Sequence, residues 1–417
     1  MATAKHNPGK KMIGAIALFV ASGFFLLALK NMDIQSLIMA FVVPLIFLAS
    51  SALIPKVFRA DSLLLSLVNL LCSLGVLVLY RISPEKGINQ AINYGAGVLA
   101  MILCMLAIRH LSRFKPLLVI AAGGALVLMA LPVVIGREVG GAKAWIALGG
   151  LNFQPSELVK VVLVVVNAYL LSKRKVLLSI IFTGICLVFL LLQKDLGTAL
   201  LYFIVSLLMM YVSTGSFALL GAGFGGAAAA GILGYSWLKS MGFAHIDRRI
   251  TAWTNPWGNY ENEGFQTVQS LLAIVNGGLF GLGLGAGNAS KIPVRETDSI
   301  FPFIVNEFGI ILGICLIILY IIIFIRGIGI SSRCNHRFHS LLAMGCSLFI
   351  AFQTFVIIGG NINLIPITGV TLPFISYGGT SLLSSLCLIG LLQGIESINE
   401  DHIAQDAKMA TMGDELP

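Results

Sequence analysis

The sequence KSMGFAHIDRRITAWTNPWGNYENEGFQ (residues 239–266) opens the one long break in a chain that is otherwise an almost continuous series of apolar segments. The break continues through the weakly amphipathic residues 267–286 and closes with GNASKIPVRETDSIF, residues 287–301. In compact chains, structureless connections longer than about 15 residues are uncommon unless they carry a function. The apolar segments are therefore expected to hold this break at one face of the molecule.

The composition is that of a membrane protein. Of the 417 residues, 58% are hydrophobic and 11% are charged, whereas soluble domains carry about 25% charged residues. The net charge of +9 is spread over short loops, which fits membrane topology better than a nucleic-acid-binding face. The seven cysteines show neither a disulfide framework nor metal-binding spacing to histidine. We expect an all-α, polytopic helical bundle and no nucleic-acid partner.

Twelve apolar segments approach the roughly 20 residues that a membrane-spanning helix needs. They cover approximately residues 12–29, 36–54, 62–80, 89–108, 116–134, 156–172, 176–192, 196–212, 216–238, 299–325, 339–360 and 373–395. If all twelve span, most loop Lys and Arg residues fall on one side, which the positive-inside rule assigns to the cytoplasm. Both termini are then cytoplasmic, and the large loop between the ninth and tenth spans is extracellular.

The long break combines cations, tryptophans and a carboxylate at the start of a helix. Arg248 and Arg249 precede Trp253, and Arg295 precedes Asp298. One interpretation is a solvated outer loop whose charges keep it in water. The other is an active site at the membrane surface, where the cations bind an anionic lipid headgroup and Asp298 acts as a base. Composition alone leaves both interpretations open.

Several ionisable residues fall within the predicted spans, where each costs roughly 2.5–3.5 kcal/mol on insertion scales. In QPSELVK, Glu157 and Lys160 share one helical face and are able to form an ion pair, with substrate binding as the alternative role. Asp195, in QKDLGT, lies at the outer boundary, where snorkelling to water would also explain it. Glu307, in IVNEFG, lies two to three turns beyond Asp298, and packing against a buried cation competes with a catalytic role.

Two further outer loops carry polar and aromatic residues among glycines. Residues 136–157, GREVGGAKAWIALGGLNFQPSE, contribute Lys143, Trp145 and Gln154. Residues 361–381, NINLIPITGVTLPFISYGGTS, contribute Ser376, although a backbone turn or close helix packing would also explain the glycines beside it. The sequence has no P-loop and no nucleotide-binding glycine fingerprint between a strand and a helix, which disfavours nucleotide chemistry.

Taken together, these segments resemble the SEDS family (shape, elongation, division and sporulation proteins), which includes FtsW, RodA and SpoVE. The resemblance covers roughly residues 62–396 and rests on GAKAWIALGGLNFQPSELVK, QKDLGTA, RRITAWTNPW, EGFQTVQSLLAIVNGGLFGLGLG, TDSIFPFIVNEFG and LIPITGVTLPFISYGGTS. It implies a SEDS polymerase core at 62–396. Because the family usually has about ten spans, residues 1–61 are predicted to add a cytoplasmic segment and two further transmembrane helices, and 397–417 a cytoplasmic tail.

The resemblance implies a peptidoglycan glycosyltransferase of the hexosyltransferase type, acting in cell division, elongation or sporulation. Such an enzyme polymerises lipid II at the outer face of the bacterial cytoplasmic membrane and works with a class B penicillin-binding protein. Its other expected partners are the nascent glycan strand and membrane lipids. The family aspartate required for polymerisation falls on Asp298, a family cation falls on Arg249, and further motifs fall on Gln154–Glu157 and Gln193–Thr198.

The sequence departs from the family pattern at two positions near these motifs. Ala144 stands where the family commonly has Arg, and Lys143 is predicted to supply that charge. Ser299 replaces the phenylalanine that follows the family aspartate, which leaves the carboxylate itself intact.

On this hypothesis, Asp298 takes the proton from the 4-hydroxyl of a lipid-linked GlcNAc as it attacks the anomeric carbon of the growing chain's lipid-linked MurNAc. Inversion at that carbon needs a base but no protein nucleophile. The candidates to neutralise the departing undecaprenyl pyrophosphate are Arg249, Arg248, Lys143 and Arg295. A divalent cation, Mg²⁺ or Mn²⁺, is a further candidate, and no organic cofactor is expected.

Two other classes of function stay open on the sequence. A lipid II flippase would need a polar path through the bundle, which Glu157, Lys160 and Glu307 could line. A non-catalytic scaffold of the cell-wall synthesis complex would tolerate the loss of Asp298.

Overall fold

The computed structural model describes residues 10–111, 115–148, 151–240, 244–287 and 291–413, which form fourteen helices and three short strands. The helices are α1 (Lys10–Asn31), α2 (Ile34–Phe58), α3 (Ser62–Ile82), α4 (Pro84–Leu111), α5 (Lys115–Ile135), α6 (Pro155–Ser172), α7 (Val176–Leu192), α8 (Leu196–Thr214), α9 (Phe217–Ser240), α10 (Ala244–Thr254), α11 (Phe265–Gly277), α12 (Ile300–Ser332), α13 (Arg337–Asn361) and α14 (Gly379–Gly413). The strands are β1 (Arg137–Val139), β2 (Ala142–Leu148) and β3 (Leu151–Phe153).

Among the described helices, ten are long and apolar enough to cross a membrane by length and composition. Two shorter apolar helices, Val176–Leu192 and Phe217–Leu233, complete the twelve predicted segments. Helices suit this environment because every backbone polar group in the bilayer core must find its partner within the protein. The predicted class, a polytopic helical membrane bundle, is confirmed. Residues 397–413, predicted as a tail, continue the last helix without interruption.

The three strands are the exception to the all-α prediction. They form an antiparallel sheet in the order β1-β2-β3, with Arg137 opposite Trp145 and Ile146 opposite Phe153. Gly140 and Gly141 make the first turn with φ angles of 61° and 85°, values that favour glycine. The prediction of an outer loop for this stretch is therefore incomplete. β1 and β3 have only three residues each, and the seven residues of β2 include a single polar side chain, Lys143, so the sequence shows no clear alternation of polar and apolar positions.

Local sequence sets the ends of the helices that carry the site. Pro155 occupies the first turn of α6, where its missing N–H group costs nothing. The Asp195 side chain caps α8 by accepting a hydrogen bond from the Thr198 N–H at 3.1 Å. Only residues 193–195 separate α7 from α8, and Lys194 makes that turn with φ 60°.

The helix α12 is interrupted near its beginning. Gly309 has φ 89° and ψ 166°, so residues 300–308 form a short segment that is set apart from the rest of the helix. Backbone groups freed by the break are bonded by the glycine-rich segment after α11: Leu282 N–H to Asn306 O (3.0 Å), Gly283 N–H to Glu307 O (2.9 Å), Ile310 N–H to Gly278 O (2.9 Å) and Ile311 N–H to Leu279 O (3.3 Å). The backbone groups at the break are therefore hydrogen-bonded to residues 278–283.

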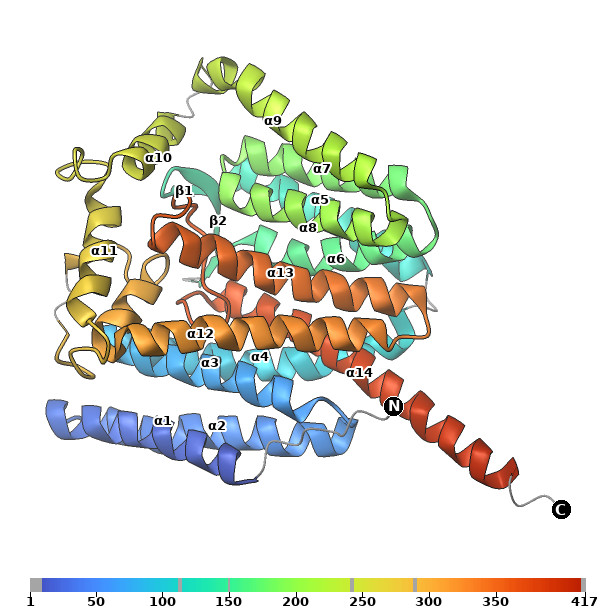
Figure 1. Cartoon of the computed structure of the whole chain (residues 1–417), viewed down its shortest axis with the longest axis horizontal. Helices are drawn as coiled ribbons and strands as arrows, with labels where there is room; N and C mark the ends of the chain where they lie inside the picture. The colour runs from blue at the N-terminus through green and yellow to red at the C-terminus, as the bar shows by residue number, and fades with distance from the viewer. Residues whose placement is uncertain (1–9, 112–114, 149–150, 241–243, 288–290, 414–417) are drawn as a thin grey trace.

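The bundle is packed around α13 and α14, with α12 beside α13 and α4 along α14 (Figure 1). Gly390 allows the last of these contacts, because a Cβ atom there would lie 2.4 Å from the carbonyl oxygen of Met101. The helices α1 and α2 form a hairpin at the edge of the bundle, against α3, with Phe24, Val43 and Tyr80 in a buried apolar cluster of their own.

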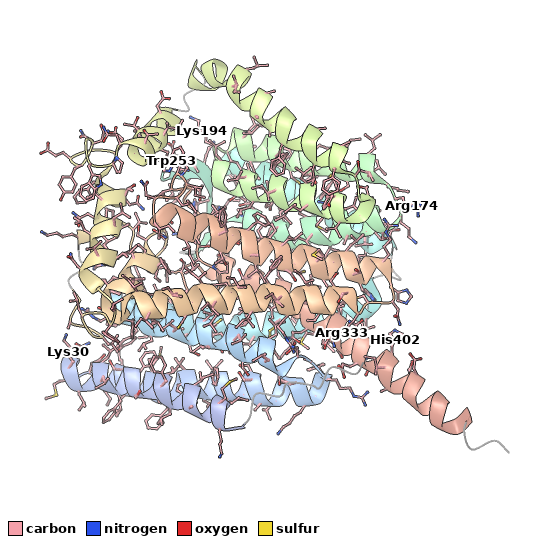
Figure 2. All side chains as sticks on the ribbon, in the orientation of Figure 1. Lys30, Arg174, Lys194, Trp253, Arg333 and His402 are labelled. Carbon is pink, nitrogen blue, oxygen red and sulfur yellow. The ribbon has the colours of Figure 1, made fainter. Side chains whose placement is uncertain are left out.

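The sheet, α10 and α11 lie at the same end of the bundle, called the loop end below (Figure 1). Lys30, Lys194 and Trp253 lie at this end in Figure 2, whereas Arg174, Arg333 and His402 lie at the opposite end.

Candidate active site at the loop end

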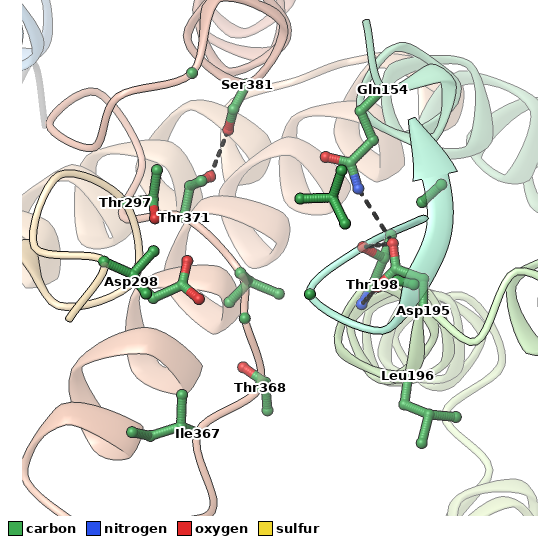
Figure 3. Close-up of a pocket in the computed structure, with 18 of the residues that line it drawn as sticks. Gln154, Asp195, Leu196, Thr198, Thr297, Asp298, Ile367, Thr368, Thr371 and Ser381 are labelled. Carbon is green, nitrogen blue, oxygen red and sulfur yellow. Dashed lines mark hydrogen bonds between the residues drawn. The ribbon is translucent and has the colours of Figure 1, made fainter. Parts of the chain in front are cut away.

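A cavity of about 910 Å³ lies at the loop end. Its wall comes from β1–β3 and their turns, the first turns of α6 and α8, α10, the segment before α12, and the segment between α13 and α14. Eight residues predicted from the sequence line it: Trp145, Gln154, Glu157, Lys160, Asp195, Arg248, Arg249 and Asp298. Figure 3 shows Asp298 on one side of the cavity and Gln154 with Asp195 on the other.

The backbone around Asp298 is fixed by side chains from two other segments. The Asp298 carbonyl accepts a hydrogen bond from Asn361 Nδ2 at 2.8 Å, at the end of α13. The carbonyl of Thr297 accepts one from Ser376 Oγ at 2.6 Å. The loop that carries the carboxylate is therefore anchored through two of its own carbonyl groups.

The Asp298 carboxyl group is harder to ionise than an ordinary aspartate. Burial raises its pKa to about 6, and the nearby charge of Glu296 acts in the same direction. The Thr297 hydroxyl and the positive charge of Arg249 oppose this rise. A carboxylate with a pKa near neutrality suits proton transfer at neutral pH, because it is mostly ionised yet holds a proton more strongly than a free aspartate.

Arg249 reaches the same part of the cavity from α10. Its Nη1 donates to the Thr368 carbonyl at 3.0 Å, which fixes the guanidinium. A Cβ atom built on Gly369 would lie 3.5 Å from Arg249 Nη2 and 3.7 Å from Asp298 Oδ2. Gly369, with φ 78°, thus lets backbone approach the cation and the carboxylate together.

The opposite wall carries a second polar group. Gln154 Nε2 donates to Asp195 Oδ2 at 3.1 Å, and Thr198 Oγ1 donates to the same oxygen at 2.8 Å. Burial raises the pKa of Asp195, while its bonds from Thr198 lower it. Two sequence motifs that are 41 residues apart therefore meet in one hydrogen-bonded group.

Glu157 and Lys160 form an ion pair at the inner part of the wall. Lys160 Nζ lies 2.6 Å from Glu157 Oε2 and also donates to Gln353 Oε1 at 3.3 Å. Ser384 Oγ donates to Glu157 at 3.0 Å. Both side chains line the cavity, but the lysine is only 2% exposed, against 14% for the glutamate, so Glu157 is the more accessible member of the pair.

Four predicted site residues lie outside the wall. Lys143 donates to the Val133 carbonyl at 2.9 Å, at the end of α5, so the cavity does not receive the charge expected in place of the family arginine. Ser376 is occupied with backbone bonds, and Arg295 does not line the cavity either. Glu307 is also separate from the cavity. Its carboxylate lies 3.2 Å from Arg81 Nε. This contact is the packing against a cation that is one of the two interpretations of Glu307.

The sequence analysis missed one charged pair in the wall. Lys86, on the first turn of α4, donates to the Glu296 carboxylate and lies 5.9 Å from the centre of the Tyr377 ring. Glu296 immediately precedes the TDSIF motif, so its position could have been noticed. Its partner is 210 residues away, and no local pattern indicates which lysine that is.

The carboxylates of the cavity do not form a protein metal site by themselves. Across the residues that the structure describes, no group of three or more His, Cys, Asp or Glu side chains could hold a metal ion. Asp298 and the group around Asp195 belong to opposite walls (Figure 3).

The fold and the cavity define a polytopic membrane protein with a polar cavity at one end of its helical bundle, where an ionisable carboxylate lies beside a fixed cation. Residues 61–401 match the family profile described as cell cycle protein, of the FtsW, RodA and SpoVE type. The chain belongs to this family.

Relatives with curated names agree with this membership. The peptidoglycan glycosyltransferase RodA of Mycobacterium bovis is 32% identical over 375 residues, covering 80% of this chain and 77% of the relative. Stage V sporulation protein E of Bacillus subtilis is 31% identical over 362 residues, covering 80% and 96%.

Two solved structures share the fold. One is a chain of a peptidoglycan synthase complex, from work on the coordination of polymerization and crosslinking; it has a TM-score of 0.69 and 27% identity, and the match covers 82% of this chain and 98% of that one. The other is the rod shape determining protein RodA of Thermus thermophilus, with a TM-score of 0.61 and 28% identity over the same shares.

Proposed function

We propose that this chain polymerises lipid II into glycan strands, with Asp298 as the catalytic base. It is a peptidoglycan glycosyltransferase, the activity for which its relatives in the family are named. The observation that carries the assignment of the site is the Asp298 carboxylate, which lies in the cavity wall close to the Arg249 guanidinium.

The reaction needs one base and one leaving group. The 4-hydroxyl oxygen of a lipid-linked GlcNAc attacks the anomeric carbon of the growing chain's MurNAc, and the bond from that carbon to the pyrophosphate oxygen breaks. Asp298 accepts the hydroxyl proton, and the electron pair leaves with undecaprenyl pyrophosphate. Because the attack inverts the carbon in a single step, no protein nucleophile is required.

The pyrophosphate gathers negative charge as it departs, and Arg249 is the cation best placed to oppose that charge. It is held by Thr368, so little reorganisation is needed when the charge develops. Arg248 is exposed on the same helix and lines the cavity. We propose that any Mg²⁺ or Mn²⁺ at this site is held mainly by the pyrophosphate oxygens of the substrate, and that no organic cofactor takes part.

The rate of polymerisation is expected to fall as the pH is lowered through about 6, because protonation of Asp298 removes the base. The measurement is kcat/KM for lipid II between about pH 5 and about pH 8, with enzyme returned to neutral pH to show that the loss is reversible. A rate that stays constant across the pKa of Asp298 would contradict the assignment.

We propose that the loop end faces the outside of the cytoplasmic membrane and that both termini are cytoplasmic. The charges of the connecting loops support this orientation, since Lys173, Arg174 and Lys175 gather in the connection between α6 and α7, and Arg333 follows α12 at the same end (Figure 2). The active site then meets lipid II in the outer leaflet, with the lipid tails between helices.

We further propose a class B penicillin-binding protein as the partner that cross-links the new strands. The likeness to a chain of a synthase complex that couples polymerization to crosslinking supports this pairing. Co-purification from native membranes, followed by identification of the bound protein, tests it. Recovery of the chain without any transpeptidase would contradict it.

A lipid II flippase is less well supported. Beyond the sheet and the connecting segments of the loop end, the described cavity residues on the long helices extend to Lys160 in α6, Leu201 in α8, Phe349 near the middle of α13 and Ser381 in α14. Within the described ranges, none of the basic residues at the opposite end of the bundle lines this cavity. Among the described residues, the cavity therefore extends no further than about the middle of α13 and does not connect the two ends of the bundle.

The deciding experiment uses the purified full-length chain with lipid II, with and without its transpeptidase partner, and separates the products by gel electrophoresis. Glycan polymer is the expected result. Transfer of labelled lipid II across vesicle membranes without polymer would support the flippase, and the absence of both activities would support a scaffold.

A further inference from the structure

The end of α1 is tied to the break in α12. Lys30 Nζ, in the last turn of α1, donates to the Gly285 carbonyl, which also accepts a hydrogen bond from Arg81 Nη2 at 3.0 Å. The Gly285 N–H donates to Glu307 Oε2 at 3.1 Å, and Arg81 Nε lies 3.2 Å from Glu307 Oε1. The carbonyl of Gly285 is thus held by two cations, and the N–H group of the same residue is held by a carboxylate.

Glu307 is nearly inaccessible, with 1% of its side chain exposed, so its charge depends on these partners. A buried carboxylate without a paired cation is strongly unfavourable. Glu307 also belongs to the short segment 300–308, and its carbonyl accepts one of the bonds that close the break at Gly309. The side chain and the backbone of the same residue therefore fix the glycine-rich loop against this segment.

The direction of the short segment determines where Asp298 lies, because Asp298 is only two positions before its first residue, Ile300. Gly285 has φ 80°, and a Cβ atom there would lie 3.0 Å from Lys30 Nζ and 3.3 Å from Arg81 Nε. Lys30, Arg81 and Glu307 together form what we call the Gly285 clamp. Only glycine fits at position 285, because the cations pack closely against its backbone.

We propose that Lys30, Arg81 and Glu307 are positioning residues for the transferase reaction, which clamp Gly285 and so set the direction of the segment that carries Asp298. This proposal rests on the proposed function and gives the hairpin of α1 and α2 a role in it. That hairpin lies outside the matched residues 61–401, so Lys30 supplies a contact from beyond the shared core. Glu307 acts through the clamp and does not touch the substrate.

Lys30 is the residue to test, because it lies near the surface and its removal leaves Arg81 paired with Glu307. Lys30→Met is expected to lower kcat about ten-fold with little change in KM for lipid II, since small displacements of a reacting group cost up to about 100-fold. Lys30→Arg should restore kcat to within about two-fold because it keeps the charge and a donor. Lys56→Met, at an exposed lysine near the other end of the hairpin, is the matched control and should leave kcat unchanged.

The pH profile separates positioning from a loss of folded protein. If the segment loosens, Asp298 becomes better hydrated, its pKa falls toward the ordinary value, and the acid limb of the rate profile moves to lower pH. A smaller amount of folded enzyme would instead lower the rate equally at every pH, and the midpoint of the acid limb would stay where it is in wild type. An unmoved limb with unchanged kcat in Lys30→Met overturns the proposal.

Hydrogen exchange provides a measurement that needs no activity. Lys30→Met should speed amide exchange in peptides that cover residues 278–310, where the bonds across the break lie, and leave α13 unchanged. Equal exchange in Lys30→Met and wild type overturns the clamp. If the wild-type chain makes no polymer, the proposed function fails, and the exchange result still decides whether the clamp exists.

Discussion

Asp298→Asn is expected to reduce polymer formation by about 1,000-fold, the largest effect of any single substitution in this chain. The amide keeps the size and planar shape of the side chain but cannot accept the proton of the attacking hydroxyl. The measurement is the initial rate of glycan formation from lipid II by purified protein, with the partner transpeptidase present at equal amounts for both variants.

The stability of the same variant shows that the loss is chemical. Because the pKa of Asp298 in the folded protein, about 6, lies above its ordinary value of 3.8, the ionised carboxylate opposes folding at neutral pH. Asp298→Asn should therefore unfold at a higher temperature than wild type near pH 7. Glu261→Gln, which changes an exposed carboxylate at the loop end outside the cavity wall, is the matched control and should keep full activity. If Asp298→Asn made polymer at the wild-type rate, the assignment of Asp298 as the catalytic base would be refuted.

Arg249→Met is expected to reduce the rate about 100-fold, because a fixed positive charge near the leaving group is lost. It should also move the acid limb of the pH profile upward, since the charge of Arg249 lowers the pKa of Asp298. The measurement is kcat/KM over the pH range used for wild type. These two effects together distinguish a charge that faces both the base and the pyrophosphate from one that only holds the loop.

Two comparisons test whether charge alone is enough. Arg249→Lys keeps the positive charge but loses the fork geometry that reaches Thr368, so an intermediate rate is expected. Arg248→Met removes an exposed cation from the same helix and should cost only a few-fold. Equal losses for Arg248→Met and Arg249→Met would show that the cavity responds to general charge and not to the guanidinium beside Asp298.

The parts of the site that the sequence predicted are those set by local chemistry. Asp298 stands at the start of a helix within a charged break, and Asp195 stands at a helix cap, so each could be recognised from its own neighbours. Glu157 and Lys160 are three residues apart in α6, and the structure has the ion pair that this spacing allows.

The parts that the sequence did not predict depend on distant partners or on strand geometry. For Glu307 the sequence indicates either packing against a buried cation or a catalytic role, and it does not indicate that the cation is Arg81, from α3. Lys143 and Ala144 are neighbours in β2, and side chains alternate across a strand. Ala144 consequently lines the cavity while Lys143 bonds to the end of α5, a distinction that a loop assignment could not make.

The uninterrupted course of α14 has a topological consequence. It begins at Gly379, beside the cavity residues Thr380 and Ser381, and continues for 35 residues to Gly413. At 1.5 Å per residue such a helix is about 50 Å long, more than the thickness of the hydrocarbon layer. Because α14 is longer than the hydrocarbon layer is thick, its last turns extend beyond the apolar core of the membrane. One continuous helix thus connects the rim of the cavity with the water on the opposite side of the bilayer (Figure 1).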